Sequence, residues 1–203
     1  MTPKAVLEVQ GSMPVAGETL RLGTWKLAEG SVMRLVGAPA ELIAKAFLGL
    51  EPAAQIRMVG AKAGTQEART VSAIAFADFE PISSLKVLEH LALAVRIGPP
   101  RLGKVPPFRD VLDEVGLAAW ANTPARELTS EGRLQLSLAM LLVRLLPVWV
   151  LALPPAFDSS PQVVVRIKEA IAAGVAVVMV TDDEALIGLA SQTRRLELRP
   201  AQD

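Results

Sequence analysis

The stretch Ser31–Leu50, SVMRLVGAPAELIAKAFLGL, constrains the fold of this chain more than any other part of it. The apolar run Val32–Val36 predicts a buried strand, and the loop Gly37–Ala40 separates it from a helical pattern. The apolar positions of that pattern share the spacing of one helix face: Leu42, Ile43, Ala46, Phe47 and Leu50. The stretch therefore predicts a strand, a short loop and a helix that reaches about residue 49.

This loop lacks the groups with which a strand–loop–helix unit binds phosphate. The motif G-x-x-x-x-G-K-[ST] supplies inward-turned backbone N–H groups, a lysine for the outer phosphates and a hydroxyl for Mg²⁺. Here the loop consists of Gly37, Ala38, Pro39 and Ala40, and Pro39 has no N–H. The nearest lysine, Lys45, lies off the apolar helix face, which is typical of a solvated surface residue. The sequence predicts the frame of a phosphate site without its binding groups.

Composition narrows the classes of function. A chain of 203 residues allows one or two compact domains, and a formal net charge of zero gives no electrostatic case for nucleic acid. The absence of cysteine excludes disulfides and thiol catalysis and fits a cytosolic protein. A single histidine, His90, argues against a histidine-based metal site or a Ser–His–Asp triad. The start MTPKAVLEVQ lacks the apolar segment of a signal peptide.

The longest apolar run, Leu136–Phe157, has more than one interpretation. Arg144 lies within the run and Pro147 interrupts it, so we expect a buried helix to about residue 146 and then a buried strand over 148–153. A membrane-spanning helix is the alternative, and the surplus of apolar residues also fits an interface with partner subunits.

Strand and helix patterns alternate along the chain, which predicts an α/β fold with a parallel core sheet. The expected strands lie at residues 5–9, 20–27, 32–36, 55–59, 71–76, 148–153, 175–181 and 194–198. The expected helices beyond the first lie at residues 85–95, 108–115, 132–146, 161–173 and 183–191. Residues 97–107 are rich in glycine and proline and are expected to form a linker.

The order of these pieces resembles the ATP-binding subunit of ABC transporters over nearly the whole chain. FLGLEP at 47–52 is similar to the family's LAGLEP, and SLKVLEHLAL at 84–93 is similar to LTVLENLAL. VLDEVGLAAWANTPARELT at 111–129 resembles the segment before the signature motif. VAVVMVTDDEALIGLASQTRRLEL at 175–198 resembles the closing strand, switch, helix and strand. No single motif is intact, so the resemblance rests on four segments in the family's order.

The resemblance implies a specific architecture. The chain would be a P-loop NTPase-like ABC nucleotide-binding domain with a mostly parallel core sheet, N-terminal antiparallel strands and a small helical subdomain. Residues 1–203 would form this single domain, with the core at 1–84 and 147–203 and the helical subdomain at about 85–146.

At positions that contact nucleotide in this family, the resemblance implies losses. Ala40 or a gap replaces the lysine, and Ala77 replaces the glutamine that senses Mg²⁺. The strand that should end in Asp-Glu ends in Ala152-Leu153, which removes the Mg²⁺-holding and water-activating carboxylates. Asp182 stands where the family has its switch histidine. We therefore expect no catalytic residue, no bound cofactor and no metal.

The resemblance also implies where partners would touch the chain. The signature LSGGQ is replaced by LTSEG at 128–132, where Thr129 or Ser130 can cap a helix and Glu131 places a carboxylate that would repel a phosphate. Ordinary capping of a surface helix is an equal alternative. The family's D-loop survives in part at 155–158. The candidate partner contacts are Ala77, Asp78, Phe79, Ser130, Glu131, Gly132 and Asp158.

Several residues have a structural interpretation beside the functional one. Asp158, Asp182 and Asp183 could form a metal cluster, but acids after strand ends usually form turns or cap helices. His90 is interpreted as a surface or structural histidine. The three tryptophans are expected in the core or at an interface: Trp25, Trp120 and Trp149.

The resemblance implies a catalytically inactive ABC-type ATPase-like subunit. It would be a structural or regulatory partner of an active ATPase subunit and a membrane permease, cytoplasmic and held at the inner face of the membrane through them. A homodimer is an alternative assembly. The alternative functions are an ATP site displaced to Lys45 with Asp158 or Asp182, and a stand-alone protein-interaction adaptor with the same fold.

Overall fold

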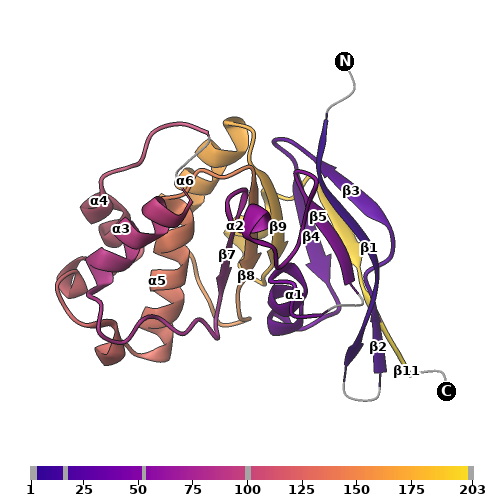
Figure 1. Cartoon of the computed structure of the whole chain (residues 1–203), viewed down its shortest axis with the longest axis horizontal. Helices are drawn as coiled ribbons and strands as arrows, with labels where there is room; N and C mark the ends of the chain where they lie inside the picture. The colour runs from indigo at the N-terminus through magenta and orange to yellow at the C-terminus, as the bar shows by residue number, and fades with distance from the viewer. Residues whose placement is uncertain (1–3, 16–17, 52–53, 99–101, 201–203) are drawn as a thin grey trace.

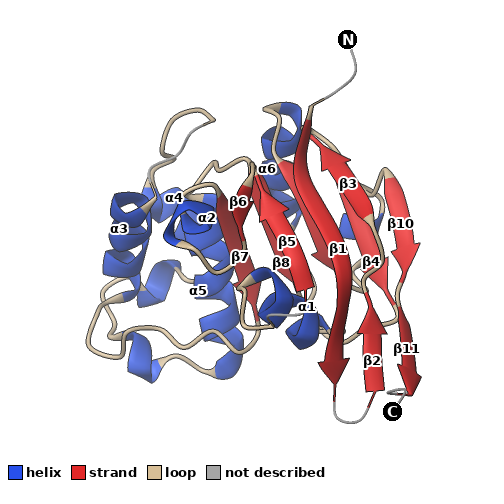
Figure 2. Ribbon diagram, turned by 45° about the vertical axis from the view of Figure 1, so that its right-hand side comes forward, coloured by secondary structure: helices blue, strands red, loops and turns tan. Residues whose placement is uncertain are grey.

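The strands of the computed structural model form two sheets, and the helices gather mainly on one side of them (Figures 1 and 2). The structure describes residues 4–15, 18–51, 54–98 and 102–200. Residues 52 and 99–101, which belong to the expected family-like segment and linker, lie outside the described residues.

The five-stranded sheet is parallel throughout, as the alternating pattern predicts. Its spatial order is β10 (Gln192–Arg195), β4 (Val32–Val36), β9 (Ala176–Val180), β8 (Val148–Ala152) and β7 (Ser72–Phe76). The central strand β9 and its neighbour β8 read AVVMV and VWVLA, which is the continuous apolar composition of strands buried on both faces.

The second sheet is antiparallel and is built mainly from the N-terminal part of the chain (Figure 2). Its strands are β11 (Glu197–Pro200), β2 (Glu18–Arg21), β1 (Ala5–Val15), β5 (Ala54–Met58) and β6 (Ala61–Lys62), with β3 (Trp25–Ala28) paired to β1. The antiparallel N-terminal strands are confirmed.

The longest helices cover the parallel sheet on the side away from the antiparallel sheet, where Figure 1 shows α3, α4 and α5 together. The helices are α1 (Ala40–Phe47), α2 (Gln66–Arg69), α3 (Val87–Ile97), α4 (Phe108–Glu114), α5 (Ser130–Leu142), α6 (Pro161–Ala172) and α7 (Glu184–Ile187). Helix α1 packs in the same apolar cluster as strands of both sheets.

Two apolar clusters lie on opposite faces of the parallel sheet, and β8 contributes side chains to both. Trp149 and Leu151 join the cluster beneath the helices, whereas Val148 and Val150 join the cluster between the sheets. This division follows from the alternation of side chains along a strand. The indole N–H of fully buried Trp149 donates to the carbonyl of Arg144 at 2.9 Å, so its one polar atom is satisfied.

Several sequence expectations about element bounds are wrong. The single strand at 20–27 is two strands, because Gly23 turns the chain with φ +70° and donates its N–H to the carbonyl of Gly11. The terminal strand at 194–198 is divided at Leu196 between the two sheets. The helix at 183–191 is only the four residues of α7.

The apolar run 136–157 is divided between the end of α5 and β8. Helix α5 ends at Leu142, earlier than expected, and Arg144 then donates to the carbonyls of Gly98 and Arg69. Burial lowers the pKa of the Arg144 guanidinium. Within the described ranges, no helix has the length and apolar character needed to cross a membrane.

Candidate functional site

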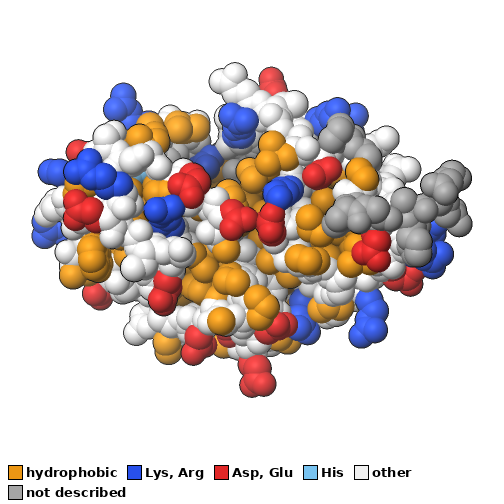
Figure 3. Space-filling view, turned by 90° about the horizontal axis from the view of Figure 1, so that it is seen from below, with side chains coloured by type: hydrophobic (Ala, Val, Ile, Leu, Met, Phe, Trp, Pro, Cys, Tyr) orange, Lys and Arg blue, Asp and Glu red, His pale blue; other side chains and the backbone are white. Residues whose placement is uncertain are grey.

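The loops expected to form the site lie side by side at one edge of the parallel sheet. Because β4, β9 and β8 are parallel neighbours, the segments that follow them, 37–39, 181–183 and 153–158, leave the same carboxyl edge. Ligands of open α/β sheets bind at this edge. Figure 3 shows hydrophobic side chains gathered across the middle of the lower face, with acidic side chains among them.

The loop after β4 has only three residues before α1 begins at Ala40. Pro39 is the N-cap residue and contributes no side-chain hydrogen bond. Glu41 lies in the first helical turn, where its carboxylate interacts favourably with the helix dipole. It also pairs with Lys45, and this pairing raises the lysine pKa. The lysine is thus at the surface as expected, and its ammonium group is engaged by the Glu41 carboxylate.

The glycine of this loop has a structural role. Gly37 has φ +89°, and a Cβ built on it would lie 2.5 Å from the carbonyl oxygen of Leu196. The Leu196 N–H in turn donates to the carbonyl of Val36 at 2.7 Å. The C-terminal segment therefore crosses directly over the loop, and this crossing accounts for the glycine without a phosphate.

The end of β8 presents no side-chain oxygen. Ala152 and Leu153 are each 1 % exposed, and the Leu153 N–H donates to the carbonyl of Val180 at 2.9 Å. Two buried apolar side chains at this point can neither hold Mg²⁺ nor accept a proton from water.

The two acids after β9 have different roles. The exposed Asp182 lies 3.7 Å from the guanidinium of Arg34, which also donates to the carbonyl of Thr181 at 3.4 Å. Asp183 is buried and caps α7, accepting from the N–H groups of Ala185 and Leu186. The N-cap interpretation of Asp183 is confirmed.

Asp183 also joins two loops of the site edge. Its Oδ2 accepts from the N–H of Ser159 at 2.7 Å, and its Oδ1 accepts from Ala185 at 2.8 Å. Burial alone would raise the pKa of Asp183, but hydrogen bonds from Ser159, Leu186 and Ala185 together lower it below its ordinary value. The carboxylate therefore serves backbone donors rather than a metal. Across the described residues, no group of three or more acids or histidines is placed to hold a metal ion.

The start of α5 is capped from within the chain. The Thr129 hydroxyl accepts from the N–H of Gly132 at 3.1 Å, and exposed Glu131 lies in the first turn. Gly132 is buried, and a Cβ there would approach Leu128 at 3.3 Å. The expected capping by Thr129 is confirmed.

We expect Thr129→Ala to lower the free energy of unfolding by about 1 kcal/mol, because the Gly132 N–H loses its acceptor. Thr129→Ser keeps a hydroxyl at the same place and is expected to recover most of that loss. Urea denaturation of the two variants checks this; equal destabilisation would show that the hydroxyl is not the stabilising group.

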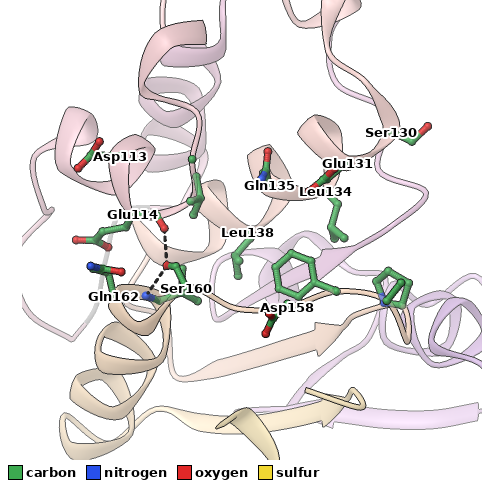
Figure 4. Close-up of a pocket in the computed structure, with 16 residues that line it drawn as sticks. Asp113, Glu114, Ser130, Glu131, Leu134, Gln135, Leu138, Asp158, Ser160 and Gln162 are labelled. Atoms are coloured by element: carbon green, nitrogen blue, oxygen red, sulfur yellow. Dashed lines mark hydrogen bonds between the residues drawn. The ribbon is translucent and has the colours of Figure 1, made fainter. Parts of the chain in front are cut away.

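A cavity of about 680 Å³ brings some of the candidate partner residues together (Figure 4). It lies between the end of α4, one side of α5 and the segment from β8 into α6. Ser130, Glu131 and Asp158 line it, whereas Ala77 and Asp78 are not among its lining residues. The sequence reasoning missed this cavity; the only local signal was the four-residue spacing of Leu134 and Leu138 on α5.

The candidate contacts after β7 are not among the residues that line that cavity. Phe79 packs against the helical cluster and meets Phe76 edge to face, with ring centroids 6.1 Å apart. Asp78 follows the end of β7 in the turn that leaves the sheet. Of the seven candidate contacts, Ser130, Glu131 and Asp158 therefore line the cavity, whereas Ala77, Asp78, Phe79 and Gly132 do not.

The histidine and two of the tryptophans have structural roles. His90 is 1 % exposed; its Nε2 accepts from the N–H of Ile82 at 3.0 Å, and its Nδ1 lies 2.9 Å from the carbonyl of Lys86. Trp25 and Trp149 are buried, as expected for core residues. Trp120 is 43 % exposed, so of the two expected positions, core or interface, the core does not apply to it and the interface stays a prediction.

Solved structures with the same fold include ATP-binding subunits of ABC transporters. One described as such a subunit has a TM-score of 0.74 and 18 % identity, covering 95 % of this chain and 86 % of that chain. A nucleotide-free ATP-binding cassette has a TM-score of 0.65 and 13 % identity, covering 98 % and 92 %. The protein cbiO1 from Clostridium perfringens has a TM-score of 0.59 and 15 % identity, covering 97 % and 88 %.

Sequence comparisons give no further relatives: no family model matches the chain, and no curated protein does. At these identities the likeness shows the fold. The chain has the α/β fold of ABC nucleotide-binding domains, with a parallel core sheet and an antiparallel N-terminal sheet. The fold expected from the family resemblance is confirmed.

Proposed function

We propose that this chain is a catalytically inactive ABC-type ATPase-like subunit, which acts as the structural or regulatory partner of an active ATPase subunit. The observation that carries the proposal is the end of β8, where Ala152 and Leu153 are buried and apolar at the position where the family resemblance requires two carboxylates. ATP hydrolysis needs a metal and an activated water, and these side chains can provide neither.

The loop after β4 supports the same proposal. It has no lysine or hydroxyl, and its glycine is accounted for by the crossing of Leu196. The Glu41 carboxylate occupies the helix turn that would otherwise attract phosphate. Of the residues of a displaced nucleotide site, Lys45 is already paired with Glu41, and Asp182 lies 3.7 Å from the guanidinium of Arg34.

The partner role rests on the fold and on what similar proteins do. The similar protein cbiO1 is described as part of the ABC transporter complex cbiONQ. By analogy, this chain would take the place of one ATPase subunit beside a membrane permease, at the cytoplasmic face of the membrane. Its candidate contact residues are Ser130, Glu131 and Asp158 at the cavity, with 77–79 as a separate contact.

Titration with a fluorescent ATP analogue in the presence of Mg²⁺ tests the inactive state. We expect no saturable binding and no phosphate release from ATP, while an intact ABC ATPase under the same conditions shows both. Saturable Mg²⁺-dependent binding would overturn the proposal in favour of a displaced site.

Co-purification tests the partner role. The chain is expressed with an intact ABC ATPase and a permease encoded beside it, and we expect all three to purify together. The double variant Glu131→Lys/Asp158→Lys should weaken this complex, because it reverses two charges at the cavity. The matched variant Glu29→Lys/Glu67→Lys reverses two exposed charges elsewhere and should leave it intact. A monomer that never co-purifies would instead support the stand-alone adaptor.

A further inference from the structure

We propose that the cavity beside α5 binds a small organic cation with an apolar body, a role that goes beyond the proposed partnership and does not depend on it. Its volume, about 680 Å³, lies in the range of pockets that enclose small organic ligands. Such pockets combine mainly apolar walls with a few polar groups that set ligand orientation and specificity.

Apolar side chains form the walls from two directions. Leu134 and Leu138, one helical turn apart on α5, line one wall (Figure 4). Phe157, between β8 and α6, and Val163, in the first turn of α6, also line the cavity. Leu134 and Leu138 also belong to the buried core, so this wall is held by packing on its far side. The apolar part of a ligand can therefore displace water from side chains that are held in position before the ligand binds.

The floor of the cavity is tied together by hydrogen bonds. The Ser160 hydroxyl donates to the carbonyl of Glu114 at 2.7 Å and accepts from the N–H of Val163 at 3.3 Å (Figure 4). These bonds join the end of α4 to the start of α6. The α4 and α6 sides of the cavity are thus held together by these bonds rather than by a loop that must close.

The charge of the cavity selects a cation. Four carboxylates line it, and its lining residues include no lysine or arginine. Glu114 is neutralised by Arg166, with Nε and Oε2 3.1 Å apart. The other three, Asp113, Glu131 and Asp158, are exposed and form no ion pair with any described residue. A cleft that combines one sign of charge with apolar walls concentrates ligands of the opposite charge.

A bare metal ion does not fit this arrangement. The described acids and histidines form no group of three that could hold a metal. The apolar walls would also leave most of a hydrated metal ion's surroundings without oxygen ligands. An ammonium or phosphonium group on an apolar body matches both parts of the cavity.

The test compares two ions of the same shape and opposite charge. Isothermal titration calorimetry of the full chain is carried out with tetraphenylphosphonium and with tetraphenylborate. We expect the cation to bind at least tenfold more tightly than the anion, and its affinity to fall as salt is added. Equal affinity for the two ions, or tighter binding of the anion, would overturn the proposal.

Variants locate the site. Glu131→Gln/Asp158→Asn is expected to lower the affinity for tetraphenylphosphonium about tenfold, because two attractive charges are lost. Ala156→Trp should lower it by filling the cavity without changing the charge. The matched control Glu29→Gln/Glu67→Gln removes two exposed carboxylates that do not line the cavity.

The urea midpoint of each variant is measured beside its affinity, so that loss of binding is separated from loss of folding. The control variant should bind the cation as the unmodified chain does. If the cavity variants keep their folding midpoint and bind the cation with unchanged affinity, the cation is bound elsewhere and the assignment is wrong.

Discussion

Gly37→Ala is expected to lower the free energy of unfolding by about 3 kcal/mol. The left-handed backbone at φ +89° costs a residue with a Cβ about 1 kcal/mol. The new Cβ would also meet the carbonyl oxygen of Leu196 at 2.5 Å, and a backbone atom cannot turn aside as a side chain can. Moving it would break the hydrogen bond from Leu196 N–H to Val36, at a further cost of about 1 kcal/mol or more.

Gly60→Ala is the matched control, because Gly60 has φ +84° but no neighbour within 4 Å of its Cβ position. It should show the backbone cost alone, about 1 kcal/mol. Urea denaturation of both variants measures the difference. If the two are destabilised equally, the crossing of Leu196 is not what requires the glycine, and a lost phosphate-binding role becomes the better explanation of Gly37.

Asp183→Ala is expected to lower the free energy of unfolding by about 3 kcal/mol at neutral pH. Three N–H groups, of Ser159, Ala185 and Leu186, lose their acceptor, and each is at least partly buried. Asp182→Ala is the control: its carboxylate is largely exposed and 3.7 Å from Arg34, so its removal should cost less than about 0.5 kcal/mol.

The effect of Asp183 should depend on pH in one direction. Its pKa in the folded protein is lowered, so the carboxylate stabilises the fold fully above the pKa of the unfolded chain, about 3.9. As the pH falls below about 4 and through the folded pKa, the carboxylate is protonated and this contribution is lost. The difference in stability between the unmodified chain and Asp183→Ala should therefore shrink in acid. A difference that stays constant down to the folded pKa would contradict this account.

Sequence patterns predicted those strands and helix caps that depend only on residues close together in the sequence. The continuous apolar runs of β8 and β9 indicate strands buried on both faces, and the structure places β9 at the centre of the sheet with β8 as its neighbour. Thr129 before a helical pattern predicts a cap, and its hydroxyl accepts the expected bond. The fold class followed because strands alternating with helices have few ways to bury their apolar faces.

What a residue does at the site depended on partners distant in the sequence. Residues 182 and 183 are both aspartate, yet the side chain of Asp182 is exposed, whereas that of Asp183 joins α7 to Ser159. The division of the terminal strand at Leu196 was missed because its two halves pair with different sheets, a choice that the local pattern does not contain.

The sequence by itself determined the alternation of elements, the apolar centre of the sheet, the absence of lysine from the loop after β4 and the absence of carboxylates at Ala152 and Leu153. Only the tertiary structure showed that Gly37 is required by the crossing of Leu196 and that Glu131 and Asp158 share a cavity. The physical reason is that periodicity and capping act within a few residues, whereas close backbone approach and a shared cavity exist only after distant segments have packed together.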